Sequence, residues 1–357
     1  MEDLIYLLGL HYLGFTHKKL HHIFEKSENY KEIFTKVSAS NLSKDGFNSE
    51  QIEFILERKK KLNLDLLSKK LDDRYVKIIT IKDKDYPEIL KNSSNPPYLF
   101  YLRGKIDNSP KIAVVGSRKI TSYGEKVISM IIPDLSKYFT IISGGAAGCD
   151  TCAHEETMKA DGITISVIGT GIDLDYPVGN KKIYDKIVET GGAVISIFPL
   201  GEIGNAYNFP IRNEIVSALS VGVIVIEARE KSGSLITAKL ALEQGKDLFA
   251  IPGDINKANS GGCNNLIKNS EAKLVTKSED ILEEYNILLS GNKEIIEKKF
   301  EQELDKIIYD LLLLEGLSID EICEKLSYDI STMSFRTSMM ELEGFIKKGS
   351  DGKFMSL

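Results

Sequence analysis

The chain has 357 residues, a formal net charge of −6 and an apolar content of 42%, which fit a soluble globular protein of two or three domains. The acidic balance excludes a uniformly basic nucleic-acid protein, so any binding of nucleic acid has to come from a local patch. No run of 18 apolar residues occurs, and four cysteines are too few for a disulfide framework. The acidic start Met1-Glu2-Asp3 lacks the features of a signal peptide, and we expect a cytoplasmic protein without membrane contact.

Residues 1–68 are predicted to form a small helical domain. Apolar residues such as Leu4, Leu8 and Leu20 recur there at helical spacing, and breaks fall at Gly14 and near Gly46. Short helices with such turns are typical of SAM-like or helix-hairpin-helix-like modules. They are equally typical of a packing appendage on a larger domain.

Over residues 69–288 the pattern changes to apolar, β-branched runs that alternate with helical segments. Strands without polar alternation predict a parallel sheet covered by helices on both faces, and therefore an extended Rossmann-like α/β fold. The predicted strands are 76–81, 98–103, 111–115, 140–142, 163–168, 193–197, 222–226 and 247–251.

The end of the chain predicts a further, smaller domain. Residues 289–301 are polar and lysine-rich, as in a linker, and three helical segments and a strand–turn–strand follow over residues 302–357. Ser318 and Glu321 have the spacing of a capping box at the start of the second helix. Three helices followed by a small hairpin are typical of a winged helix.

Four glycine-marked turns follow predicted strands of the central domain and precede polar or helical segments. They are Val115-Gly116-Ser117-Arg118, Ser143-Gly144-Gly145-Ala146-Ala147-Gly148, Gly169-Thr170-Gly171 and Ser232-Gly233-Ser234. Helix N-termini direct unpaired N–H groups at anions, so such turns at the edge of a parallel sheet favour phosphate groups. The turns contain neither a strict G-x-G-x-x-G, nor a P-loop, nor an obvious acid/base pair. We therefore expect a phosphate-backbone binder with no cofactor and no catalytic residue.

Four side chains stand out as ligand contacts. Arg118 lies in the first turn, where a guanidinium beside helix-terminal N–H groups forms a fork for phosphate; the alternative is a local ion pair. Phe209, Arg212 and Asn213 combine an aromatic ring with polar groups, as in a platform for single strands. The alternative is a core phenylalanine beside an arginine in a structural ion pair.

Asp150 and His154 stand four residues apart and therefore on one face of a predicted helix. They could form an acid/base pair, but we interpret them as a buried polar clamp that holds the preceding glycine loop. Cys149 and Cys152 form a C-x-x-C pattern without two further ligands at zinc spacing. We therefore expect no metal site and interpret both cysteines as helix-packing residues.

Eight motifs, in order over residues 70–285, resemble those of the DNA processing protein A (DprA/Smf) family. They are Asp85-Tyr86-Pro87, Pro96-Pro97, Val114 to Arg118, the Ser143 to Gly148 turn with Asp150 and His154, Gly169 to Asp173 with Tyr176-Pro177, Phe209-Pro210-x-Arg212-Asn213, Ser232 to Ala238 and Ile251-Pro252-Gly253. The resemblance implies a non-enzymatic homodimer with an extended Rossmann fold. It further implies a protein that binds and protects single-stranded DNA and loads the RecA recombinase during natural transformation.

Three positions depart from the family pattern, and we expect them to affect DNA affinity or the dimer. Val178 follows the Tyr-Pro pair where many relatives have a basic residue, with Lys181 and Lys182 as the nearest substitutes. Ile197 replaces a usual glutamate, and Glu214 replaces a second arginine. With these motifs carried over, the predicted DNA-binding residues are Gly116, Ser117, Arg118, Ser143, Gly144, Gly145, Lys181, Phe209, Arg212, Asn213, Ser232, Gly233, Ser234 and Thr237.

Two other functions stay open at this point. One is a nucleotide-acting enzyme similar to nucleoside-phosphate hydrolases, although their P-G-G-x-G-T-x-x-E motif is absent. The other is a regulator that reads duplex DNA through the winged-helix-like tail, where Lys347 and Lys348 lie. Release of a base from a nucleoside monophosphate would favour the enzyme. Sequence-specific duplex binding that is lost on deletion of residues 300–357 would favour the regulator.

Overall fold

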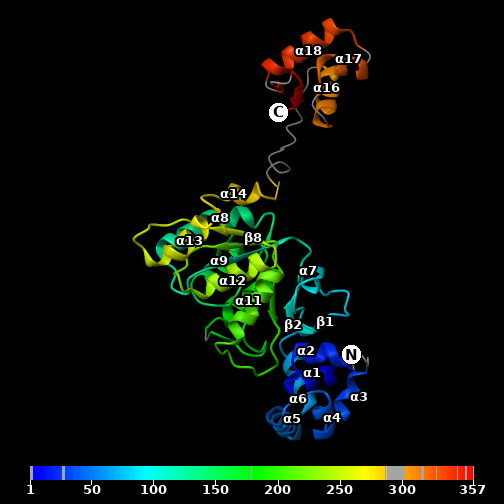
Figure 1. Ribbon diagram of the computed structural model, residues 1–357, viewed down its shortest axis with the longest axis vertical. Helices are drawn as coiled ribbons and strands as arrows, with labels where there is room; N and C mark the ends of the chain where they lie inside the picture. The colour runs from blue at the N-terminus through cyan, green and yellow to red at the C-terminus, as the bar shows by residue number, and fades with distance from the viewer. Residues whose placement is uncertain are drawn as a thin grey trace. The chain divides into compact units, whose positions relative to one another are not determined.

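The computed structural model describes residues 3–25, 29–177, 179–285, 287, 302–314, 317–326, 328–343, 345–349 and 352–356. The chain folds into two compact units, Met1–Ile287 and Leu288–Leu357 (Figure 1). The predicted linker 289–301 and Val178 lie outside the described residues. Among the described helices, none is both long enough and apolar enough to cross a lipid bilayer.

The described part of the first unit is built around a nine-stranded sheet with the order β1-β2-β6-β5-β4-β3-β7-β8-β9. From β6 to β9 in this order, all neighbouring strands are parallel, as their unbroken apolar runs predict. The strands are β1 (Val76–Thr80), β2 (Leu99–Gly104), β3 (Lys111–Val115), β4 (Thr140–Ser143), β5 (Thr164–Ile168), β6 (Ala193–Ser196), β7 (Gly222–Val225), β8 (Asp247–Ala250) and β9 (Lys273–Leu274).

One edge of the sheet departs from the predicted parallel arrangement. Strand β2 pairs antiparallel with both β1 and β6. The connection between β1 and β2 contains the four-residue helix α7 (Glu88–Lys91). After it, the chain returns beside β1 in the opposite direction.

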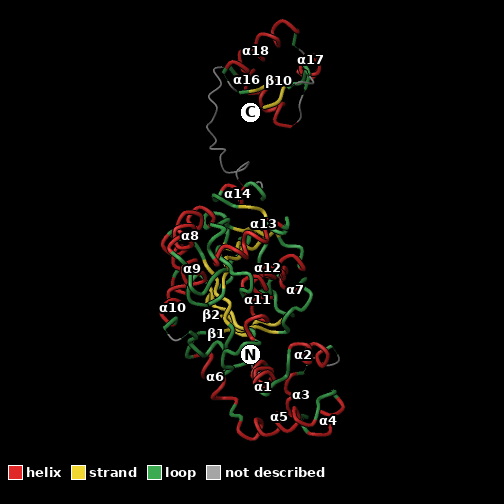
Figure 2. The backbone as a smooth tube through the Cα atoms, turned by 60° about the vertical axis from the view of Figure 1, so that its left-hand side comes forward, coloured by secondary structure: helices red, strands yellow, loops and turns green. Residues whose placement is uncertain are grey.

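Helices cover both faces of the sheet. Figure 2 shows α8, α9 and α10 along one side of the strands and α7, α11 and α12 along the other. On the second side, Ile215, Leu219 and Ala238 pack in one buried cluster with the sheet residues Ala113 and Val115. The remaining helices of this region are α8 (Ser122–Leu135), α9 (Cys149–Lys159), α10 (Lys181–Glu189), α11 (Asn208–Ala218), α12 (Gly233–Glu243), η1 (Ala258–Ser260), α13 (Gly261–Lys268) and α14 (Glu279–Leu282).

The N-terminal helices gather beside β1 and β2 (Figure 1). Leu20 belongs to the same buried cluster as Leu99 and Tyr101 of β2, so these helices and the sheet share apolar packing. His17 donates from Nε2 to the carbonyl of Ile197 at 2.8 Å. The assignment of these helices to a SAM or helix-hairpin-helix class, and a domain boundary after residue 68, stay predictions. They are α1 (Leu4–Tyr12), α2 (His17–Phe24), α3 (Tyr30–Thr35), α4 (Ala39–Lys44), α5 (Ser49–Lys61) and α6 (Leu64–Asp72).

In its described residues, the second unit contains three helices and a two-stranded antiparallel sheet. Strand β10 (Ile346–Lys348) pairs with β11 (Phe354–Ser356). The predicted capping box is confirmed, because Ser318 N donates to Glu321 Oε2 at 2.7 Å and Glu321 N donates to Ser318 Oγ at 3.3 Å. The order of these elements fits the predicted winged helix, which stays a prediction. The helices are α16 (Glu303–Leu314), α17 (Ile319–Leu326) and α18 (Ile330–Leu342).

Candidate nucleic-acid interface

The candidate site lies where the sheet changes its direction of winding. From β3 the chain moves outward through β4, β5 and β6, and then returns to β7 on the other side of β3. The last residues of these two central strands, Val115 and Val225, are partners in the parallel register. Loops that leave such neighbouring strands in opposite directions open a crevice at the carboxyl edge of the sheet.

A groove of about 550 Å³ opens at this point, and we call it the switch-point groove. It joins the turns after β3, β4 and β7 with the start of α11. A smaller recess of about 160 Å³, the side recess, adjoins it and is lined by Gly145 together with Arg118, Tyr176, Phe209 and Arg212. The predicted DNA-binding residues that line the switch-point groove are Gly116, Arg118, Gly144, Phe209, Arg212, Asn213, Ser232, Gly233, Ser234 and Thr237.

Arg118 extends from the turn after β3 as an exposed side chain. Its guanidinium carbon lies 4.9 Å from the centroid of the Phe209 ring, which is cation–π distance. An aromatic face holds a guanidinium in place without using its N–H donors, so these stay available to an anion. The ring of Phe209 is therefore neither a simple core residue nor an open platform, because it supports Arg118 within the groove.

Arg212 lies at the floor of the groove and is only 5% exposed. It donates from Nη1 to the carbonyl of Val167 at 2.7 Å and from Nε to Asn213 Oδ1 at 3.0 Å. Burial lowers its pKa, and the nearby carboxylate of Asp150 opposes this effect in part. A desolvated cation that is incompletely compensated favours an anion above it. Arg212 thus has structural partners, as the alternative interpretation expects, and also faces the groove.

Asp150 and His154 hold the glycine loop from beneath. Asp150 Oδ2 accepts from the N–H of Ala146 at 3.2 Å, and His154 Nε2 donates to the carbonyl of Gly144 at 2.8 Å. His154 Nδ1 lies 2.7 Å from the hydroxyl of Thr164. Burial lowers the pKa of His154 to about 4, so its imidazole is neutral and keeps these two bonds. The predicted polar clamp is confirmed.

Gly144 itself leaves the space that this clamp needs. A Cβ at this position would lie 2.4 Å from Arg212 Nη1 and 2.4 Å from Asp150 Oδ2. We expect Gly144→Ala to lower the free energy of unfolding by about 1–3 kcal/mol, as overpacking does. Urea unfolding measures this loss. Gly233→Ala is the matched control, because its Cβ would meet no described atom within 4 Å; equal losses in both variants would contradict the argument.

The buried imidazole of His154 makes stability depend on pH. The pKa of His154 is about 6.5 in the unfolded chain and about 4 in the folded one, so the unfolded chain binds the proton more tightly. The neutral state of His154 therefore contributes roughly 3 kcal/mol to the free energy of unfolding. This contribution is complete above pH 6.5 and is lost as the pH falls toward 4. His17 has a similar shift. We expect the free energy of unfolding, measured with urea, to be lower at pH 4.5 than at pH 7.5. The difference between the two pH values should be smaller in His154→Gln. A variant with the same pH dependence as the parent would contradict this assignment.

Helix α12 begins at the groove with a serine cap. Ser232 Oγ accepts from Ser234 N at 3.3 Å and lies 2.7 Å from Ser234 Oγ. Ser234 and Thr237 are buried, whereas Gly233 is exposed at the first helical position. The N-terminus of this eleven-residue helix therefore adds its partial positive charge to the groove, as the turn predicts.

Two residues predicted to contact DNA have hydrogen bonds within the fold. Ser143 is the last residue of β4, is fully buried, and donates from its hydroxyl to the carbonyl of Val114 at 2.6 Å. Its predicted contact with DNA is corrected, because the interior of the sheet encloses this side chain. Ser117 Oγ bonds to the backbone of Lys119, so it shapes the turn that carries Arg118.

Lys181 does not line the groove but lies next to the side recess. It is the exposed first residue of α10, and the amide of the preceding Asn180 donates to the carbonyl of Gly145 at 2.9 Å. The two described departures from the family pattern lie elsewhere. Ile197 is buried, and Glu214 accepts from Asn95 Nδ2 at 3.0 Å.

The cysteines of the C-x-x-C pattern lie in the first turns of α9. Cys149 and Cys152 are free thiols, burial raises the pKa of Cys149, and burial raises the pKa of Cys152 to about 11. Both are therefore protonated, in line with their interpretation as packing residues. In the part of the chain that the structure describes, no group of three His, Cys, Asp or Glu side chains could hold a metal ion.

Several residues at the site carry no signal in the sequence. Asn205 belongs to the loop before α11, where its Oδ1 accepts from the N–H groups of Tyr207 and Asn208 at 2.9 and 3.0 Å. Tyr176 is part of a family motif but was not predicted to meet the ligand. The groove-lining residues that sequence analysis did not single out include Gly204, Asn205 and Ala206.

Comparisons with known proteins find similar sequences and structures. The family model of DNA recombination-mediator protein A matches residues 77–286. DNA processing protein DprA of Streptococcus pneumoniae is 43% identical over 208 residues, which cover 58% of this chain and 73% of that protein. Protein Smf of Escherichia coli is 35% identical over 279 residues, which cover 75% of this chain and 74% of that protein.

Two solved structures are similar as well. The X-ray structure of DNA processing protein A from Streptococcus pneumoniae has a TM-score of 0.67 at 36% identity and covers 78% of this chain and 97% of that one. The structure that describes the single-stranded DNA binding mode of DNA processing protein A from Helicobacter pylori has a TM-score of 0.53 at 28% identity, and covers 59% of this chain and 95% of that one. This chain therefore belongs to the DNA recombination-mediator protein A family, the DNA processing protein A family that its motifs resemble.

Proposed function

We propose that this protein binds single-stranded DNA in the switch-point groove, protects it, and passes it to the RecA recombinase during natural transformation. One observation carries the proposal: the exposed guanidinium of Arg118 is held on Phe209 above the buried Arg212, in a groove that α12 enters with its N-terminus. Two arginines and a helix terminus suit the phosphates of a flexible strand. The relative from Helicobacter pylori, whose single-stranded DNA binding has been described, supports the same ligand.

We propose further that the protein is not an enzyme. Hydrolysis of a nucleotide requires an acid or base within hydrogen-bond reach of the substrate. Asp150 is the carboxylate among the described groove-lining residues, and it accepts the N–H of Ala146. His154 is buried with both ring nitrogens in contact with loop and strand atoms. These groups are occupied in holding the loop, which supports a binding role over the nucleoside-phosphate hydrolase alternative.

The alternative of a duplex-DNA regulator has less support. Helix α18 is the third helix of the second unit, where a winged helix carries its recognition residues. Its basic residue Arg336 donates from Nε to Asp305 Oδ1 at 2.7 Å, and Phe335 is exposed beside it in sequence. A helix whose guanidinium is already paired offers little to the phosphates of a duplex. We therefore assign α18 no part in binding DNA.

The family also supports a homodimer and RecA as a partner. Strand β9 ends the described sheet, and Leu274 on it is 44% exposed. A free strand edge with an exposed apolar residue suits pairing with a second copy. Light scattering tests the dimer. A pull-down of purified RecA in the presence of oligo-dT tests the partner.

A fluorescence anisotropy titration tests the central proposal. The full chain is titrated into labelled oligo-dT and into a duplex of equal length at several salt concentrations. We expect tighter binding of oligo-dT, with a log–log salt slope of about −0.7 for each phosphate contact. Preferential binding of the duplex would contradict the proposal, and release of free base from a nucleoside monophosphate would support the enzyme alternative.

A further inference from the structure

A second cavity lies apart from the switch-point groove, and its volume is about 650 Å³. It reaches Lys111, the first residue of β3, and Val221, which directly precedes β7, so we call it the amino-edge cleft. The switch-point groove lies at the opposite, carboxyl edge of the same two strands. Among the described lining residues, the cleft and the groove have none in common. A ligand of the groove therefore does not account for the cleft.

Two connections of the chain wall the cleft, and the sheet forms its floor. One wall is the segment 84–89, which leads into α7, and the other is the segment 105–110 between β2 and β3. Ile79 of β1 and Leu102 of β2 are buried on the floor, and the partly buried Ile106 adds an apolar side chain from the second wall. Apolar cavities of roughly 300–1,000 Å³ are typical of sites for small molecules.

Buried polar groups hold both walls in place. Lys111 is 7% exposed and donates from Nζ to the carbonyls of Asp107 and Ser109, each at 2.7 Å. On the other wall, the hydroxyl of the buried Tyr86 donates to the carbonyl of Pro97 at 2.7 Å. Because these bonds fix the walls, the cleft is preformed, and a ligand does not have to order them.

Three lysines border the cleft. Lys77, Lys84 and Lys105 are exposed, and none of them forms an ion pair with any residue that the structure describes. Lys77 lies opposite Leu102 in the register of β1 and β2. It also stands two residues before Ile79 and therefore on the same face of the strand. Its positive charge thus adjoins the apolar floor.

The carboxylates at the cleft do not cancel these charges. Asp107 pairs with Lys111 at 3.3 Å, and Glu88 pairs with Lys91 at 3.8 Å. Asp85 is the third lining carboxylate, and it stands against three lysines. The cleft therefore combines an apolar floor with a border of net positive charge.

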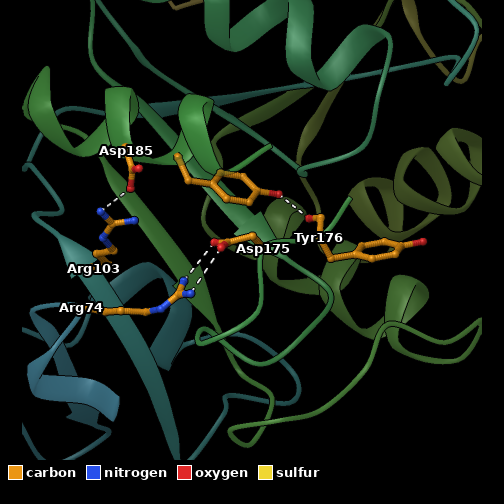
Figure 3. A network of polar contacts seen from close by, with 6 residues as sticks. Arg74, Arg103, Asp175, Tyr176 and Asp185 are labelled. Atoms are coloured by element: carbon orange, nitrogen blue, oxygen red, sulfur yellow. Dashed lines mark hydrogen bonds and ion pairs between the residues drawn. The ribbon is translucent and has the colours of Figure 1, made fainter. Parts of the chain in front are cut away.

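On the other face of the same edge of the sheet, the cations have partners. Arg103 follows Leu102 on β2 and points to the opposite face, where it donates from Nη2 to Asp185 Oδ1 at 2.6 Å (Figure 3). Arg74, shortly before β1, donates to the carboxylate of Asp175 at 2.9 and 3.3 Å. Figure 3 shows each guanidinium pointing toward its carboxylate. Lysines without an ion pair are thus a property of the cleft face.

We propose that the amino-edge cleft binds a small amphipathic anion. Its apolar body lies on Ile79 and Leu102, and its acid group contacts the lysines of the border. Burial of the apolar body supplies most of the affinity, whereas the lysines select for negative charge. The site goes beyond the proposed binding of DNA and does not depend on it, because the cleft and the groove lie at opposite edges of β3 and β7.

Two fluorescent probes with the same rings test the role of charge. Anilinonaphthalene sulfonate is an amphipathic anion, and phenylnaphthylamine lacks its sulfonate. Each is titrated into the full chain, and we expect saturable binding of one sulfonate probe per chain. The double variant Lys77→Gln with Lys105→Gln is expected to bind the sulfonate probe about five-fold more weakly, as for two exposed ion pairs. Its affinity for the neutral probe is expected to equal that of the parent.

Two further variants serve as controls. Lys126→Gln with Lys186→Gln removes two exposed lysines from α8 and α10, which lie on the other side of the sheet (Figure 2), and should change neither affinity. Ile106→Trp places a larger ring in the cleft and is expected to weaken both probes about ten-fold, because it takes up the space of a ligand. Urea unfolding shows whether this variant keeps the fold.

The outcomes are distinguishable. The proposal is overturned if the parent binds neither probe saturably, or if the two lysine double variants weaken the sulfonate probe equally. It is also overturned if Lys77→Gln with Lys105→Gln weakens both probes alike, or if a folded Ile106→Trp variant keeps the parent affinity. Should Ile106→Trp unfold, the two lysine double variants decide, since their changes lie on the surface. A parent that binds the sulfonate probe but not oligo-dT would overturn the proposed function and support this site.

Discussion

Replacing Arg118 by alanine is expected to weaken oligo-dT binding by roughly 10- to 100-fold at low salt, which corresponds to one lost charge-assisted contact. The physical reason is the position of the side chain. Its guanidinium is exposed and already held on the ring of Phe209, so it loses little freedom when a phosphate binds. Anisotropy titrations over a salt series should also show a log–log slope that is less steep by about 0.7.

Two further variants control for a general loss of charge or fold. Lys119→Ala removes the adjacent exposed cation, which does not line the groove, and should reduce affinity much less. Arg118→Lys keeps the charge but loses the planar fork, so an intermediate affinity is expected. Equal effects of Arg118→Ala and Lys119→Ala would show that the groove responds only to net charge, and would remove Arg118 from the site.

Replacing Arg212 by methionine is expected to lower the free energy of unfolding by about 3 kcal/mol. Arg212 is buried and compensates the equally buried carboxylate of Asp150, whose pKa burial raises and the Arg212 charge lowers. When the guanidinium is removed, the buried carboxylate of Asp150 loses the positive charge that compensates it. Urea unfolding followed by tyrosine fluorescence measures the loss, since the chain has 15 tyrosines and no tryptophan.

A second substitution distinguishes charge compensation from simple packing. Asp150→Asn removes the carboxylate but keeps an oxygen that accepts the N–H of Ala146. In the Arg212→Met background, it should recover a large part of the lost stability, because neither charge is then left without a partner. If the double variant is less stable than Arg212→Met, the two residues do not compensate one another. DNA affinity is expected to stay low in both, since the floor of the groove has lost its cation.

The organisation of the central domain could be predicted because it depends on local patterns. Unbroken apolar runs followed by small residues and helical segments predict parallel strands, and the carboxyl ends of parallel strands meet at one edge. That is why turns as distant in sequence as Gly116 and Ser232 line one groove. The clamp of Asp150 and His154 could also be predicted, because residues four apart on a helix share a face.

Other features depend on contacts between distant segments and leave no local pattern. The burial of Ser143 follows from the neighbouring carbonyl of Val114, and strand periodicity alone does not say which end residue is enclosed. The antiparallel direction of β2 appears only in its pairing with β1 and β6, which are distant from one another in sequence. The loop around Asn205 reaches the groove only because α11 and β6 place its two ends there.

The amino-acid sequence by itself determined the family, the alternation of strands and helices, and the positions of the glycine-marked turns, since these reside in short motifs and in periodicity. Only the tertiary structure decided that Arg118 packs on an aromatic ring, that Arg212 is a buried cation, and that Arg74 forms an ion pair with Asp175. These facts join residues up to about a hundred positions apart along the chain. Burial and pairing at such separations arise when the layers of the fold pack together, so no short stretch of sequence encodes them.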